Sequence, residues 1–305
     1  MDLRQLEIIR TIAETGSFTA AGERLHVSQS AISRQIIMLE DELKEPVFLR
    51  VGRRVRITAA GESLLQLSYR IFQDLKDTVD QISDTTRPLA GSVQLAGGMT
   101  VCLYVFPSLM REFRKSHPGV DMKITASSTE RCTALVRSGL ADLALLTLPV
   151  EAPELVTVPA FDEEMLLVTS RAHPLARKRR ITAQDLRREH FVIFEAGSNS
   201  RRAIDEFFLR EQIDPRIVTE TENVEILKNL ARAGLGVTIV PYQVVAREAA
   251  AGQIFCARIH DQNLVRRLGW VYARTSRVPR TVQEMLAAFE RVRPRLRLSP
   301  SPARR

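Results

Sequence analysis

The sequence predicts a chain of two parts: an all-α N-terminal domain that ends in a long helix, and an α/β C-terminal domain. Three observations lead to this fold class. Residues 2–43 hold short helical patterns, residues 59–84 carry one long amphipathic stripe, and strand patterns alternate with helical ones from Val93 onward. At 305 residues, the chain is long enough for two or three domains with their own cores.

Composition is that of a globular protein, with 45% hydrophobic and 26% charged residues. A formal net charge of +8 favours an anionic partner, nucleic acid first. The cysteines Cys102, Cys132 and Cys256 lie far apart without a CxxC motif, so we expect neither a zinc site nor a disulfide framework. The first residues lack the apolar core of a signal peptide, and no apolar run approaches 18 residues. These features predict a cytoplasmic protein without a membrane segment, metal or cofactor.

The N-terminal domain begins with a support helix. Asp2 and Gln5 have capping-box spacing, and Leu6, Ile9 and Ile12 share one face.

A second helical pattern, with Phe18, Ala21 and Leu25 on one face, leads through a turn to a third that begins at the N-cap Ser28. The third pattern has an apolar stripe, and its polar side chains gather near the helix start. Side chains of these types read base edges and hold phosphates, so we expect DNA contacts from Ser28, Gln29, Ser30, Ser33 and Arg34.

A basic hairpin is expected at about residues 48–57, with Gly52 between two short strands. Such a hairpin can lie along a phosphate backbone, where charge positions a protein without reading sequence. The DNA contacts expected here are Arg50, Arg53 and Arg54. Together these elements form a winged helix-turn-helix.

The ordered set SFTAAGERLHVSQSAISRQI, LEDEL and PVFLRVGRRVRIT-AAGE resembles the N-terminal domain of LysR-type transcriptional regulators. The other interpretation of these residues is a generic helical hairpin with a polar outer face. Two positions depart from the family pattern: Gly22 replaces a second alanine, and Lys44 replaces a helix-ending glycine. The resemblance implies binding to double-stranded operator DNA with two-fold symmetric half-sites.

The long stripe has apolar residues three or four apart from Leu64 to Ile82. A helix of about 27 residues spans about 40 Å, which favours a partner helix over packing on its own small domain. The resemblance agrees, since LysR-type proteins dimerise through this linker helix and usually form homotetramers through their effector domains.

The C-terminal part contains two βα units. Short links between their strands and helices predict a mostly parallel sheet in each, and the closing strand and helix return to the first unit. This resembles the LysR effector domain, a two-lobed fold like that of type 2 periplasmic binding proteins. The expected domains are 1–58 (DNA-binding), 59–88 (linker helix), 89–292 (effector domain, with lobe I at about 91–160 and 267–292 and lobe II at about 161–266) and 293–305 (a disordered basic tail).

Ligands of two-lobed α/β domains bind at the carboxyl ends of strands, near helix N-termini that favour anions. By position, the resemblance implies effector contacts from hydroxyl-bearing loops. We expect a small anion to be held by Thr100, Ser128, Thr129, Thr147 and Ser200. Simple N-capping is the other interpretation of these hydroxyls, and Arg201 either adds charge or faces solvent.

No catalytic residues are predicted. The sequence lacks a G-x-S-x-G motif, and the lone Gly234–Gly236 pair lies between a helix and a strand, the reverse of the dinucleotide-binding order. A solute-binding protein for transport and an enzyme on the same fold are the competing classes. The helix-turn-helix favours a regulator of transcription over both.

Overall fold

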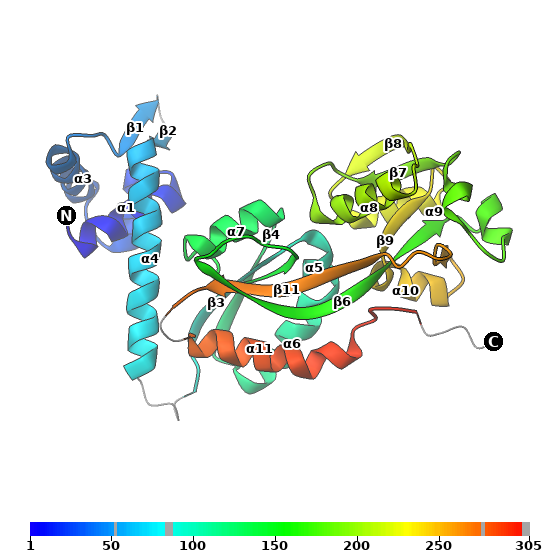
Figure 1. Ribbon diagram of the computed structural model, residues 1–305. Helices are drawn as coiled ribbons and strands as arrows, with labels where there is room; N and C mark the ends of the chain where they lie inside the picture. Colours follow the sequence, from blue (N-terminus) through cyan, green and yellow to red (C-terminus); the bar gives the residue numbers. More distant parts are fainter. Residues whose placement is uncertain (52–53, 83–87, 276–277, 301–305) are drawn as a thin grey trace. The chain divides into compact units, whose positions relative to one another are not determined.

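The computed structural model describes residues 1–300 except 52–53, 83–87 and 276–277, and the chain divides at Arg87/Pro88 into two compact units (Figure 1). Each unit is described by itself. The N-terminal unit contains α1 (Leu3–Thr15), α2 (Phe18–Leu25), α3 (Gln29–Leu43), β1 (Phe48–Val51), β2 (Arg54–Ile57) and α4 (Ala59–Ile82). β1 and β2 pair antiparallel, so α2, α3 and this hairpin form the predicted winged helix-turn-helix.

The ends of these helices follow the capping pattern of the sequence. The side chain of Asp2 accepts from the N–H of Gln5, whose own side chain accepts from the N–H of Asp2. Ser28 Oγ accepts from the N–H of Ala31 at the start of α3. At the end of α3, Lys44 takes the left-handed conformation with φ 57°, where glycine is the usual residue.

Gly22 allows the close approach between α2 and the start of α3. A Cβ atom there would lie 2.7 Å from the carbonyl oxygen of Val27 and 3.3 Å from the amide nitrogen of Gln29. The departure from the family pattern at this position therefore has a steric reason.

The linker helix α4 has two different halves. Leu64, Ile71 and Phe72 pack against the core of the N-terminal unit, and Ser68 Oγ donates to the carbonyl of Leu6 at 2.9 Å. Further along, Leu75 and Val79 are 43% and 60% exposed. Packing on the domain itself, the alternative to a partner helix, thus accounts for the first half of the stripe only.

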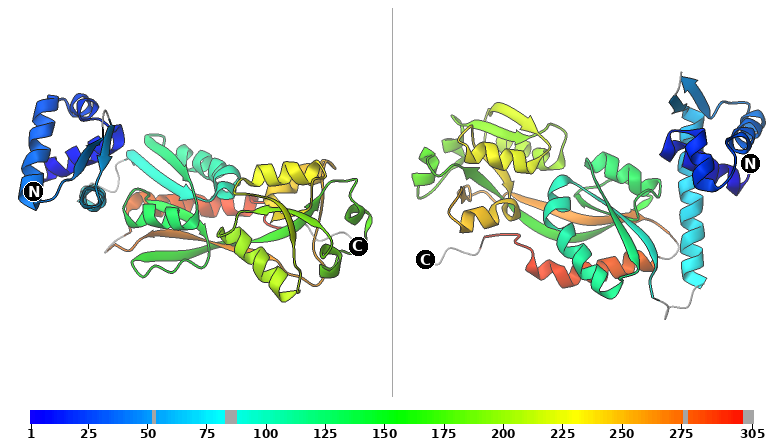
Figure 2. Two further views of the ribbon diagram at one scale, coloured as in Figure 1. Left: turned by 90° about the horizontal axis from the view of Figure 1, so that it is seen from above. Right: turned by 180° about the vertical axis from the view of Figure 1, so that it is seen from behind.

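The C-terminal unit alternates strands and helices for most of its length (Figures 1 and 2). Its first half contains β3 (Gly91–Gly97), α5 (Met99–Tyr104), α6 (Phe106–Ser116), β4 (Val120–Ala126), α7 (Thr129–Arg137), β5 (Leu143–Thr147) and β6 (Leu155–Thr169). Two 3₁₀ turns (Pro174–Arg177 and Ala183–Leu186) come next, and then β7 (His190–Phe194), α8 (Asn199–Arg210), β8 (Arg216–Thr221), α9 (Val224–Arg232), β9 (Thr238–Pro241), α10 (Tyr242–Ala250), β10 (Phe255–Ala257), β11 (Val265–Ala273) and α11 (Arg280–Val292).

The sheets are mixed, and the expectation of mostly parallel sheets is wrong for the strands that link the lobes. β3 pairs parallel with β4 and β5, and β7 pairs parallel with β8. The long strands β6 and β11 pair antiparallel with each other, and both run from one lobe to the other (Figure 1). β11 also pairs antiparallel with β5, as do β9 and β10 with β6.

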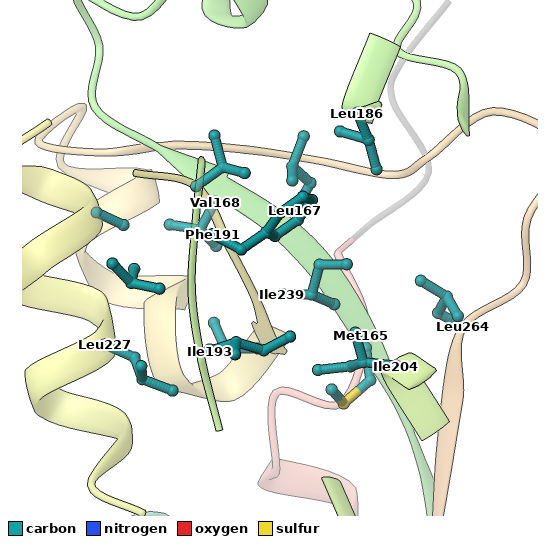
Figure 3. Close-up of a cluster of buried hydrophobic side chains, with 14 of the residues drawn as sticks. Met165, Leu167, Val168, Leu186, Phe191, Ile193, Ile204, Leu227, Ile239 and Leu264 are labelled. Atoms are coloured by element: carbon teal, nitrogen blue, oxygen red, sulfur yellow. The ribbon is translucent and has the colours of Figure 1, made fainter. Parts of the chain in front are cut away.

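Each lobe has its own core. In lobe I, Trp270 of β11 stacks on Phe106 of α6 and meets Phe289 of α11 edge to face. In lobe II, side chains of β6 such as Met165 and Leu167 meet Phe191 and Ile193 of β7 (Figure 3). Among the described residues, no helix is both long and apolar enough to cross a membrane.

Residues 293–300 of the C-terminal tail pack on lobe I, so the expectation of a disordered tail is wrong for this stretch. A 3₁₀ turn (Arg293–Arg295) follows α11, and Leu296 and Leu298 pack against the lobe I core. The carbonyl of Leu298 accepts from the N–H of Glu164 at 2.9 Å. Two leucines with one residue between them place apolar side chains on one face of an extended segment, which suffices to dock it. Residues 301–305 lie outside the described residues.

Candidate functional site

The start of α3 presents the predicted DNA-reading side chains on the surface. Ser28, Gln29, Ser30 and Arg34 are exposed, and Ser33 is half-buried. The amide of Gln29 donates to Ser33 Oγ at 2.7 Å, and the hydroxyls of Ser28 and Ser30 are 3.0 Å apart. These contacts join side chains of one helix turn, so the polar groups form a continuous surface.

The hairpin of β1 and β2 carries the other predicted DNA contacts. Arg50 lies in β1 and Arg54 in β2, whereas Arg53 lies outside the described residues. Arg56 of β2 is exposed. Because phosphate contacts need only charge at the right place, this hairpin suits positioning rather than base readout.

A cavity of about 100 Å³ lies between the lobes of the C-terminal unit. The lobe I residues that line it come from the starts of α5 and α7, from the loops before these helices and from the end of β5. Those from lobe II come from the loop before α8, with Phe194 and Glu222 beside them. The structure brings all five residues of the predicted effector site to this cavity: Thr100, Ser128, Thr129, Thr147 and Ser200.

The alternative of helix capping applies to two of the serines. Ser128 Oγ accepts from the N–H of Arg131, and Ser198 Oγ accepts from the N–H of Arg201, so each completes the first turn of a helix. Capping and lining the cavity coincide at Ser128 and Ser198, because both also face it. The first turns of α7 and α8 add positive helix ends to the cavity wall.

Arg201 does not supply charge to the cavity. Its side chain is 10% exposed and makes ion pairs with Asp205 at 2.7 Å and Glu220 at 2.6 Å. It also donates to the carbonyl of Phe194. The two expectations for this residue, a ligand contact and a solvent-facing side chain, are therefore both wrong, because two carboxylates hold it inside lobe II.

Arg266 is a cavity residue that the sequence reasoning missed. It is 4% exposed, and its guanidinium donates to Ser200 Oγ at 2.9 Å and to Glu163 Oε2 at 2.6 Å. Burial raises the pKa of Glu163, while Arg266 and Gln243 act to lower it. The signal in the sequence that could have identified Arg266 is its place as a charged residue beside the apolar run of a predicted strand. Glu163 has the same place beside the apolar run of another predicted strand.

A second polar group joins α5 to lobe II. Tyr104 lies at the end of α5, the helix that carries Thr100, but its ring packs against the lobe II core. Its hydroxyl donates to Glu225 of α9 and accepts from Lys228 Nζ at 3.3 Å. Lys228 is buried and also pairs with Glu248 at 2.6 Å. The position of α5 is thus tied to both lobes.

Comparison with known proteins supports both halves of this description. The family model of the bacterial regulatory helix-turn-helix protein, lysR family, matches residues 3–62, and that of the LysR substrate binding domain matches residues 86–293. A probable RuBisCO transcriptional regulator from Trichormus variabilis is 32% identical over 275 residues, which cover 88% of this chain and 81% of the relative. A RuBisCO operon transcriptional regulator from Allochromatium vinosum is 31% identical and matches 81% of this chain and 82% of its own.

Solved structures share the fold over nearly the whole chain. Full-length OxyR from Pseudomonas aeruginosa superposes with a TM-score of 0.82 at 24% identity and covers 99% of this chain and 98% of its own. Full-length CbnR in complex with its target DNA has a TM-score of 0.68 at 25% identity, covering 95% and 99%. The relatives are named as regulators of transcription rather than as enzymes. With both family models matched in order along its length, the chain belongs to the LysR family of DNA-binding transcriptional regulators.

Proposed function

We propose that the chain controls transcription in response to a small anion bound in the interlobe cavity. The observation that carries this proposal is the convergence of hydroxyl side chains there. Thr100 and Thr129 come from lobe I, and Ser200 comes from lobe II. Hydroxyl donors and helix N-termini favour a carboxylate, phosphate or sulfate group. A ligand that contacts both lobes changes their relative arrangement if it binds one arrangement more tightly than the other.

On DNA, we propose that residues 1–58 bind a half-site and that the linker helix, 59–88, pairs two chains so that a dimer meets two symmetric half-sites. The exposed Leu75 and Val79 on α4 support this pairing. We further propose that residues 89–292 form the effector domain and that dimers associate into a tetramer through it. Because one relative is named as a probable RuBisCO transcriptional regulator and another as a RuBisCO operon transcriptional regulator, a RuBisCO promoter is the first DNA to test, beside the DNA upstream of the protein's own gene.

The anion site is tested by calorimetry on the full-length protein with a panel of small carboxylates, phosphates and sulfate. One hydrogen bond to a charged ligand contributes about 1.5–3 kcal/mol of binding free energy. Thr100→Val and Thr129→Val should therefore each weaken binding about ten- to a hundredfold. Thr125→Val is the matched control, since Thr125 is exposed on β4 and does not line the cavity. Equal affinity in all four proteins, or a ligand that proves cationic, would place the site elsewhere.

A further inference from the structure

Arg266, which lines the interlobe cavity, belongs to a buried ion pair. Arg266 on β11 and Glu163 on β6 lie directly opposite each other in the antiparallel register. Their side chains are 4% and 0% exposed, and the guanidinium that donates to Glu163 also donates to Ser200 Oγ. Because Ser200 and Arg266 both line the cavity, the pair is linked to the space in which a ligand would bind.

Part of this pair is not satisfied by the protein. Among the described residues, Arg266 Nε and Glu163 Oε1 are buried without a hydrogen-bond partner, as is Nε2 of the neighbouring Gln243 on α10. Buried polar atoms are nearly always paired in folded proteins. The Gln243 side chain still acts on Glu163 through a hydrogen bond that lowers its pKa. Arg266 lines the cavity, and its Nε therefore marks a polar contact that the described residues do not complete.

The charges around the cavity make Arg266 the residue that determines whether an anion is attracted there. Of the described residues that line it, Arg266 is the only cationic side chain and Glu222 the only anionic one. An ionised Glu163 cancels the charge of Arg266, so an anion gains little attraction from the intact pair.

No other charged side chain is placed to compensate Glu163 within the described structure. Its neighbours on β6, Asp162 and Glu164, point to the opposite face of the strand, where they pair with Arg267 and Arg258. Gln243 approaches from α10 without a charge, and the pKa of Glu163 is raised by burial against the influence of Arg266. Protonation of Glu163 therefore frees the charge of Arg266 for a ligand, and it takes the charge of the group Arg266, Glu163 and Glu222 from one net negative charge to zero.

We propose that Arg266 selects an anion in the interlobe cavity and that Glu163 is its exchangeable counter-ion, which takes up one proton from solvent when the anion binds. The inference rests on the proposed anion site and names its charge-selecting residue. The anion adds a second negative charge beside Arg266, and transfer of a solvent proton to Glu163 removes one of them. Arg266 then faces the anion, and Ser200, whose oxygen accepts from Arg266, directs its own hydrogen into the cavity. Binding accordingly strengthens as pH falls.

Sulfate is the probe, because it stays a dianion across pH 6–8.5 and any pH dependence belongs to the protein. Full-length wild type is titrated by calorimetry in two amine buffers of different ionisation enthalpy, and the cavity component is identified as the part lost in Thr129→Val. We expect uptake of up to one proton per sulfate and an affinity that rises by up to about tenfold for each pH unit lowered. Saturable sulfate binding at this site without proton uptake would overturn the inference and leave the anion site standing.

Three variants sharpen the test. Glu163→Gln should bind sulfate more tightly at pH 8 and lose the pH dependence, whereas Arg266→Gln should lose the cavity component. Glu164→Gln is the matched control: it removes the adjacent carboxylate, which faces away, and should keep the wild-type pH dependence. If Glu163→Gln does not fold, the proton count on wild type still decides. A complete absence of binding that depends on Thr129 would overturn the proposed anion site and this inference together.

Discussion

The hydroxyl of Tyr104 offers a direct test of how the two lobes are held together. It lies between Glu225 and Lys228 of α9, although Tyr104 itself belongs to α5 beside the cavity. Replacing Tyr104 by phenylalanine removes this oxygen and leaves the ring, which packs on the lobe II core. Lys228 keeps its pairs with Glu225 and Glu248, so the change isolates the link between the lobes.

The expected loss follows from the type of contact. A hydrogen bond to a charged group contributes about 1.5–3 kcal/mol. Because Tyr104 is half-buried and the Glu225 side chain is 36% exposed, solvent screening reduces this to about 1–2 kcal/mol. In a double-mutant cycle with Glu225→Gln, most of that loss should appear as coupling between the two residues.

The protein contains one tryptophan, and this simplifies the assay. Trp270 is 2% exposed in the core of lobe I, so its fluorescence during urea unfolding reports on the C-terminal unit. Tyr104→Phe should lower the midpoint, and Glu225→Gln, which also removes the pair with Lys228, should lower it less in the Tyr104→Phe background than in wild type. Full additivity of the two changes would refute the proposed contact between the lobes.

The same bond predicts a dependence on alkaline pH. Burial, followed by the hydrogen bond to Glu225, raises the pKa of Tyr104 to about 12. An unfolded tyrosine titrates near pH 10, so the folded state holds the proton more tightly between these values. The stability advantage of wild type over Tyr104→Phe should be complete below about pH 10 and disappear as pH rises through 12. An advantage that persists unchanged above pH 12 would contradict the assignment.

Three further predictions concern the N-terminal unit. Arg34→Ala should reduce discrimination between operator and random DNA in fluorescence anisotropy. Arg53→Ala should instead weaken binding to all sequences and reduce the slope of log affinity against log salt concentration by up to about one unit. Equal loss of discrimination in the two variants would refute the division of roles. Leu75→Asp combined with Val79→Asp should make a fragment of residues 1–90 monomeric in sedimentation, because the charges replace apolar contacts that each contribute about 1.5–3 kcal/mol. An unchanged dimer would show that another face of the fragment pairs the chains. Gly22→Ala should destabilise this unit by about 1–3 kcal/mol in thermal unfolding despite the helix propensity of alanine, since the new Cβ meets a carbonyl oxygen at 2.7 Å; a gain in stability would mean that the turn relaxes freely.

Local patterns in the sequence were sufficient for the helical elements and for much of the cavity. Ser28 caps α3 because the N-cap preference depends on neighbouring residues only. Thr100 and Thr129 reach the cavity because they lie at strand-to-helix junctions on one edge of the lobe I sheet, and Ser200 lies at the equivalent junction after β7 in the separate sheet of lobe II. The fold class and the family were therefore predictable before any coordinates.

Features that depend on distant partners were not predictable in this way. Arg201 and Arg266 look alike in the sequence, yet one is neutralised inside lobe II and the other lines the cavity. The difference arises from the antiparallel pairing of β6 with β11, which places Glu163 opposite Arg266 and which strand-by-strand interpretation does not reveal. The ordered tail is a similar case, because Leu298 docks on Glu164, far away in the sequence.

The most direct test of the account is a footprint of the full-length protein on promoter DNA, taken with and without each member of the anion panel. The DNA upstream of the protein's own gene and a RuBisCO promoter serve as targets, and wild type is compared with Thr129→Val and Thr125→Val. We predict that one anion changes the footprint of wild type and of Thr125→Val and leaves that of Thr129→Val unchanged. A footprint that no anion alters, or that changes equally in all three proteins, would contradict control of DNA binding through the interlobe cavity.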